Sequence, residues 1–256
     1  MALLNRVVTP IVALDVPDRA AAQTLVRRLG DACDFYKVGL ELFSAEGPAV
    51  VAWLRDQGKR VFVDLKLHDI PNTVRGAARS VARHGATLLT VHASGGAEMI
   101  AAAVAGAAEG GSEGGSGAGA AGQTDGGCQI LGVTILTSLN ADAIGTAWGR
   151  DGVDVTREVV RLAGFAASAR AAGIVCSGHE AAAVTAAHGD ALGLLIPGIR
   201  LAGGDAHDQA RVMTPSAAAA AGARWLILGR AVTGAADPVA AMAAVRADLD
   251  GVAASA

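Results

Sequence analysis

The stretch VFVDLKLHDI, residues 61–70, places two aspartates, a lysine and a histidine at the end of an apolar run. Alternate residues of a strand share a face, so Asp64 and Lys66 should point the same way, and Lys37 could approach them from an adjacent strand. Asp69 lies beyond this run, in the turn before IPNTV. Burying such an array is costly unless its charges pair. Because nearby carboxylates favour a charged lysine, the pattern predicts a lysine that can donate a proton to a carbanion.

Other unusual residues, most of them polar, also stand at or just beyond the ends of apolar runs. They are Asp15, His92, Thr137, Ser138, Pro197, Arg200, Gly229 and Arg230. Charges on an ordinary solvated surface would scatter over helices, so this gathering favours a functional site. We interpret His92 as a hydrogen-bonding partner beneath the charged array. The alternative is a salt-bridge network that only ties strands together, and two lysines within apolar runs make it the weaker interpretation.

The elements that must position these residues recur as short apolar, often β-branched runs. They are residues 11–16, 35–40, 60–66, 88–93, 130–136, 173–178, 193–199 and 225–230. Near-continuous apolar runs are typical of parallel strands that are covered on both faces. Helix-favouring segments lie between them, with Pro238 near the start of the last segment and Gly30 and Gly85 just past helix ends.

Eight βα units in 256 residues predict an α/β fold, a (β/α)8 TIM barrel that forms one domain over residues 1–256. The catalytic face of such a barrel is the carboxyl end of its strands, where the polar residues collect. A doubly wound sheet is the alternative, but no GxGxxG follows the first run.

Two glycine-containing loops predict an anion site. Residues 197–215, PGIRLAGGDAHDQARVMTP, follow the seventh run, and LGRAVTG spans the end of the eighth. Loops at these positions often bind phosphate in (β/α)8 barrels. Backbone N–H groups around Gly229 would meet the oxygens, and Arg230 would add charge and a planar fork. Together the loops predict that the ligand is a phosphate ester.

Residues 105–127, AGAAEGGSEGGSGAGAAGQTDGG, have almost no large apolar side chain. Such a segment buries too little surface to offset its ordering entropy, so we expect a flexible surface insertion. It falls between the fourth helix and the fifth strand, at the end opposite the catalytic face. We therefore expect neither a function nor a domain boundary there.

Composition argues against several classes of partner. A formal net charge of −3 gives no broad basic field for nucleic acid, and 3% aromatic residues argue against base stacking. The apolar N-terminal stretch meets Pro10 and Asp15 too soon to span a membrane, and it lacks the signal-peptide pattern. Cys33, Cys128 and Cys176 are widely spaced and predict no disulfide framework. We expect a cytoplasmic protein with a small-molecule substrate and neither nucleic-acid nor membrane partners.

An ordered set of motifs covers nearly the whole chain. It comprises ALDV at 13–16, KVG at 37–39, FVDLKLHDIPNTV at 62–74, VTILTS at 133–138, PGIR at 197–200, DQARVMTP at 208–215 and LGR at 228–230. In this set the chain resembles the orotidine 5′-phosphate decarboxylase family of the bacterial type. The central thirteen-residue stretch is highly specific. Residues 105–127 depart from the family pattern without touching these motifs.

The resemblance implies a carboxy-lyase that converts orotidine 5′-phosphate to UMP and CO₂ in pyrimidine biosynthesis, with neither metal nor organic cofactor. Lys66 would protonate C6 of the pyrimidine, and Asp64 would lie beside the departing carboxylate, with Lys37 and Asp69 completing the array. The substrate would be bound by Asp15 and Lys37 at the ribose, Thr137 at the pyrimidine edge, and Gln209, Gly229 and Arg230 at the phosphate, with Pro197 and Arg200 shaping the closing loop. Asp69 and Thr73 would reach the partner's site in a homodimer.

Two other functions share parts of this pattern. Mg²⁺-dependent sugar-phosphate lyases of the hexulose-phosphate synthase type have a similar DxKxxD, and Asp64, Asp69, His68 and His92 include candidate hard-metal ligands. The LTS motif and the long loop after the seventh run favour the pyrimidine substrate instead. A non-catalytic nucleotide-binding barrel is disfavoured because Asp64, Lys66 and Asp69 are intact.

Overall fold

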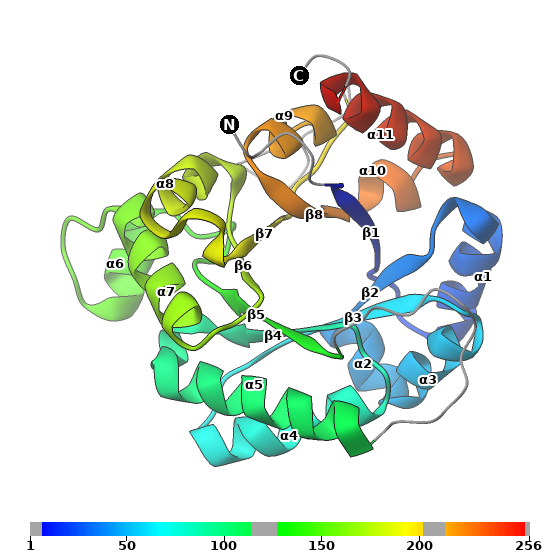
Figure 1. Cartoon of the computed structure of the whole chain (residues 1–256). Coiled ribbons are helices and arrows are strands. Elements are labelled where there is room, and N and C mark those ends of the chain that lie inside the picture. The colour runs from blue at the N-terminus through cyan, green and yellow to red at the C-terminus, as the bar shows by residue number, and fades with distance from the viewer. Residues whose placement is uncertain (1–6, 114–126, 202–212, 254–256) are drawn as a thin grey trace.

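Eight parallel strands close into a barrel in chain order, from β1 beside β2 round to β8 beside β1 (Figure 1). The computed structural model describes residues 7–113, 127–201 and 213–253. The strands are β1 (Thr9–Leu14), β2 (Phe35–Gly39), β3 (Arg60–Leu67), β4 (Leu88–His92), β5 (Gln129–Val133), β6 (Gly173–Val175), β7 (Gly193–Ile196) and β8 (Ala223–Leu228). Each overlaps a predicted apolar run, so the predicted α/β fold and its barrel architecture are confirmed.

Helices surround the barrel on its outer face (Figure 1). The α-helices of the described residues are α1 (Arg19–Leu29), α2 (Leu40–Glu46), α3 (Ala49–Asp56), α4 (Pro71–Arg83), α5 (Gly96–Glu113), α6 (Ala141–Trp148), α7 (Val155–Ser168), α8 (Gly178–His188), α9 (Pro215–Ala220), α10 (Arg230–Thr233) and α11 (Pro238–Ala253). Pro238 begins α11 and Gly30 caps the end of α1, as predicted. No helix in the described ranges combines the length and apolarity that a membrane crossing requires.

The apolar runs are buried on both sides, as their composition predicts. Inside the barrel, one residue from each of β1–β5, β7 and β8 joins a single cluster, made of Ile11, Phe35, Phe62, Leu88, Leu131, Leu195 and Trp225. A larger cluster fills the space between the strands and the helices. The barrel is therefore a packed core rather than a pore, and ligands can reach only its two ends.

The prediction of a flexible insertion over residues 105–127 is wrong for its first part. Helix α5 continues to Glu113 and packs along α4, beside it in Figure 1. The glycines permit this close packing, because a Cβ at Gly106 or Gly110 would collide with backbone carbonyl oxygens of Arg75 or Arg79 on α4. Residues 114–126 of the predicted insertion lie outside the described residues.

Candidate active site

Four charged side chains form a continuous chain of contacts at the carboxyl ends of β1, β2 and β3. Lys37 Nζ lies 2.7 Å from Asp15 Oδ1 and 3.7 Å from Asp64 Oδ2. Lys66 Nζ lies 2.8 Å from the same Asp64 oxygen. The side chains of Lys37 and Asp64 are only 9% and 13% exposed, so their charges need this mutual pairing. The structure thus brings Lys37, Asp64 and Lys66 together, as the sequence predicts, and adds Asp15, which the sequence places only on the same rim.

The backbone of β1–β3 sets up this chain of contacts. Ala13 pairs with Lys37 across β1 and β2, and Gly39 pairs with Asp64 across β2 and β3. A Cβ at Gly39 would lie 3.0 Å from Lys37 Nζ and 3.2 Å from Asp15 Oδ1. The glycine of the KVG motif therefore leaves the space in which the Lys37–Asp15 pair forms.

Asp64 and Lys66 meet at an irregularity of β3, and not through plain strand alternation. The pairing of β3 with β4 shifts between Val63 and Leu67, and Lys66 has φ +52°. Asp64 Oδ1 accepts a hydrogen bond from Thr90 Oγ1 at 2.9 Å. The predicted proximity of Asp64 and Lys66 is confirmed, but the reason that the sequence suggested for it is wrong.

His92, at the end of β4, lies beside the array. Its ring centroid is 5.5 Å from that of His68, with the rings tilted by 42°. Burial lowers the pKa of His92, and the neighbouring His68 and Lys66 lower it further, while Asp64 opposes them. The surroundings therefore favour the neutral form of this imidazole. Its predicted hydrogen bond to the array stays a prediction.

The predicted phosphate ligands follow β7 and β8. Gly229 directly precedes α10, and Arg230 is its first residue, with an exposed side chain. Arg200 is only 8% exposed, and its Nη1 donates to the carbonyl of Ile199 at 2.9 Å. Pro197 follows β7 directly, and Thr137 lies beyond β5. The predicted ligand Gln209 lies outside the described residues.

Asp69 and Thr73 stand apart from the paired charges. Asp69 is exposed in the turn before α4, where Oδ1 accepts a hydrogen bond from the Ile70 N–H at 2.6 Å. Thr73 is exposed in the first turn of α4. Two large apolar side chains are exposed beyond the carboxyl ends of the paired strands β2 and β3. They are Leu40, which begins α2, at 56%, and Ile70, just before α4, at 66%.

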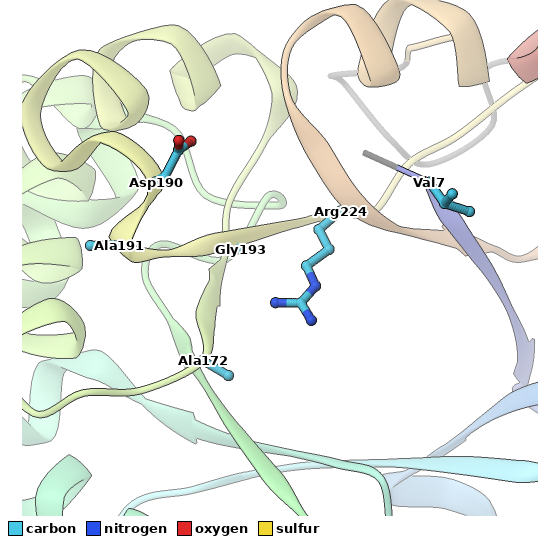
Figure 2. Close-up of a pocket in the computed structure, with 6 residues that line it drawn as sticks. All are labelled: Val7, Ala172, Asp190, Ala191, Gly193 and Arg224. Carbon is cyan, nitrogen blue, oxygen red and sulfur yellow. The ribbon is translucent and has the colours of Figure 1, made fainter. Parts of the chain in front are cut away.

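A hollow of about 520 Å³ opens at the other end of the barrel (Figure 2). It is lined by Val7, Ala172, Asp190, Ala191, Gly193 and Arg224, which lie at or before the starts of strands. It shares none of these residues with the charged array. We place the active site by its chemistry, because catalysis in this architecture occurs at the carboxyl ends of the strands. Among the described residues, no three His, Cys, Asp or Glu side chains are grouped as metal ligands would be.

A closed parallel barrel with paired lysines and aspartates at the carboxyl ends of its strands defines an enzyme of the (β/α)8 barrel class. The profile of the Orotidine 5′-phosphate decarboxylase / HUMPS family matches residues 9–245. The chain belongs to this family.

Individual relatives agree with the family match. An orotidine 5′-phosphate decarboxylase from Anaeromyxobacter sp. (strain K) is 50% identical over 93% of this chain and 96% of its own length. One from Moorella thermoacetica is 45% identical over 94% of this chain and 91% of its own. The crystal structure of orotidine 5′-phosphate decarboxylase from Lactobacillus acidophilus superposes with a TM-score of 0.80 at 35% identity, covering 96% of this chain and 100% of that one.

Proposed function

We propose that this chain decarboxylates orotidine 5′-phosphate to UMP and CO₂, as a carboxy-lyase of pyrimidine biosynthesis. The observation that carries the proposal is the contact chain from Asp15 through Lys37 and Asp64 to Lys66. It sets an ammonium group beside a carboxylate in the barrel mouth, where a carbanion would need both charge stabilisation and a proton. The named relatives, which match over more than 90% of the chain, indicate which substrate to propose.

The proposed reaction breaks the bond between C6 of the pyrimidine and its carboxylate carbon. The electron pair of that bond stays on C6 as CO₂ leaves, and Lys66 Nζ then donates a proton to C6. The lysine ends neutral and regains its proton from water. Asp64 accepts a hydrogen bond from Lys66 Nζ at 2.8 Å, so it aims the ammonium group. It would also repel the substrate carboxylate, and that repulsion is relieved as CO₂ departs.

The remaining predicted residues would hold the parts of the substrate that do not react. Asp15 and Lys37 bind the ribose hydroxyls, Thr137 the pyrimidine edge, and Gln209, Gly229 and Arg230 the phosphate, while Pro197 and Arg200 shape the loop over it. Arg230 is the first residue of α10, where its planar guanidinium can pair with two phosphate oxygens. Phosphate binding far from C6 supplies energy for closing the site.

Purified protein in excess EDTA tests the activity. We expect the absorbance of orotidine 5′-phosphate to fall and UMP to form in equal amount. The family description also covers HUMPS, so the second substrate is hexulose 6-phosphate with and without Mg²⁺. Turnover of the sugar phosphate that EDTA abolishes and Mg²⁺ restores, without decarboxylation, would replace our proposal. Calorimetric binding of UMP without turnover would indicate a non-catalytic barrel.

We further propose that the active unit is a homodimer in which Asp69 and Thr73 serve the partner's site. Their exposure, together with that of Ile70 and Leu40, supports a contact surface beside the array. Large apolar side chains exposed near each other are typical of protein interfaces.

Mixing two inactive variants tests this arrangement. After joint refolding of Lys66→Ala with Asp69→Ala, each mixed dimer would hold one site without either change, so activity should return. If Asp69 acted within its own chain, the mixture would stay inactive. Light scattering on the wild-type protein gives the oligomeric state directly.

A cytoplasmic location completes the proposal. The three cysteines are free thiols, as a reducing compartment would keep them. Fractionation of the cells that make the protein tests this placement.

A further inference from the structure

The two residues at the centre of the array both lie in a bulge of β3. Across β3 and β4, Val63 pairs with Leu89, but the next paired residues are Leu67 and Val91. Four steps along β3 therefore face two steps along β4. Lys66, within this bulge, has φ +52°, a left-handed conformation that residues with a side chain rarely adopt. Something must hold the bulge in this form, because its regular ladder bonds are interrupted.

Thr90 fills the gap from the facing strand. It is fully buried on β4, between Leu89 and Val91. Its Oγ1 accepts a hydrogen bond from the Lys66 N–H at 2.9 Å and donates one to Asp64 Oδ1 at 2.9 Å. A hydroxyl has one proton and two lone pairs, so one Thr90 oxygen serves both partners at once. The same oxygen thus ties the backbone of Lys66 to the carboxylate of Asp64.

The two oxygens of Asp64 have separate partners as a result. Oδ1 faces Thr90, while Oδ2 lies 2.8 Å from Lys66 Nζ and 3.7 Å from Lys37 Nζ. A carboxylate held at one oxygen cannot rotate without losing that bond, so its other oxygen stays aimed at the ammonium groups. The β-branch of threonine restricts its own χ1 and adds to this rigidity.

We propose that Thr90 is a positioning residue of the active site, which acts through Asp64 and Lys66 without touching the substrate. The inference rests on the proposed decarboxylation for its kinetic readout. Because a displaced proton donor costs rate rather than ground-state binding, removing the hydroxyl should lower kcat and leave KM nearly unchanged.

Two substitutions separate the hydroxyl from the methyl group. Thr90→Val keeps the shape and removes both hydrogen bonds, and we expect kcat to fall roughly ten- to a hundredfold. Thr90→Ser restores the hydroxyl and should recover kcat to within about threefold of wild type. Thr134→Val is the matched control, because Thr134 is 4% exposed and its hydroxyl donates to the Val175 carbonyl at 2.8 Å and not to a charged side chain. It should lower stability without lowering kcat.

Unchanged kcat in Thr90→Val, equal losses in the serine and valine variants, or an equal loss in the Thr134 control would each overturn the proposal. A crystal structure of Thr90→Val gives a second readout that needs no substrate. We expect Asp64 to rotate and its 2.8 Å contact with Lys66 to be lost, and retention of that contact would also overturn the proposal. A wild-type protein without decarboxylase activity would count against the proposed function alone, and the crystal structure would then decide the role of Thr90.

Discussion

Charged side chains occupy both ends of the barrel, but their partners differ. At the amino end, the guanidinium carbon of Arg60 lies 4.5 Å from the ring centroid of Phe35, and its Nη2 pairs with Asp34 at 2.9 Å. Arg224 lies equally close to the ring of Trp225. These cations cover two of the three aromatic members of the inner core cluster, Phe35 and Trp225. The planar guanidinium groups stack on the aromatic rings and so cover the end of the core.

At the carboxyl end, the charges contact one another instead of a ring. Lys37 and Asp64 are almost completely buried, whereas Asp34 at the amino end is 63% exposed. Burying charges in this way costs stability unless they pair, and strained, charged clusters persist mainly where function needs them. The comparison teaches that neither a hollow nor a single charge identifies the active site in this fold. The site is identified by charged side chains that are buried together at the carboxyl ends of the strands.

The largest difference in kcat between the two ends is expected from two separate variants, each of which removes one lysine at one end of β3. Lys66→Ala removes the proposed proton donor, and we expect kcat to fall about 10²- to 10⁴-fold. Lys59→Ala is the matched control, because Lys59 precedes β3 and donates to the carbonyls of Gly30 and Cys33. It should keep kcat. Steady-state kinetics of both variants decides the point, and near-normal turnover by Lys66→Ala would remove that lysine from the mechanism.

A change in the inner core should alter stability and spare the chemistry. Phe62, at 1% exposure, lies on β3 two residues before Asp64. Phe62→Leu should lower the free energy of unfolding by roughly 1 kcal/mol, since it makes a buried apolar side chain smaller in a packed core. The rate per folded molecule should stay at the wild-type value. Urea unfolding and kcat measured on the same sample test this, and a large loss of kcat would show that the two layers of the barrel are coupled.

A smaller effect is expected at the hollow at the amino end of the barrel. Arg224→Ala removes the stacking on Trp225, and it should lower the free energy of unfolding by about 0.5 to 1 kcal/mol. Kinetics with orotidine 5′-phosphate should not change, because Arg224 lies at the amino end of the barrel. If KM rose in this variant, the hollow of Figure 2 would contribute to substrate binding and the contrast between the two ends would fail.

The sequence predicts the rim of the barrel well, because strand ends can be recognised from apolar runs and chain order. It fails where tertiary contacts override local pattern. The bulge that brings Lys66 to Asp64 depends on Thr90, a strand residue with no local signal of its role. The glycines at 106 and 110 have loop-like composition, yet they allow α5 to pack closely on α4. In both places the local structure depends on contacts with another element, with Thr90 on β4 in the first case and with α4 in the second.

The smallest expected effect concerns the pH dependence of stability beside the array. Burial, His68 and Lys66 lower the pKa of His92, whereas Asp64 acts in the opposite direction. Below about pH 6.5 the unfolded chain therefore binds a proton at this residue more readily than the folded chain does. The free energy of unfolding therefore decreases as the pH falls from about 6.5 towards the lower pKa of the folded state. It increases again when the pH is raised, since the unfolded state binds more protons in this range.

Replacing His92 should remove this contribution. In His92→Gln, the free energy of unfolding should vary less between pH 5 and 7 than in the wild type, as measured by urea titrations at several pH values. His84→Gln, which removes an exposed histidine after α4, is the matched control. An identical slope in His92→Gln would mean that the imidazole is not held neutral by its surroundings. The carboxyl end would then differ from the amino end in its paired charges alone.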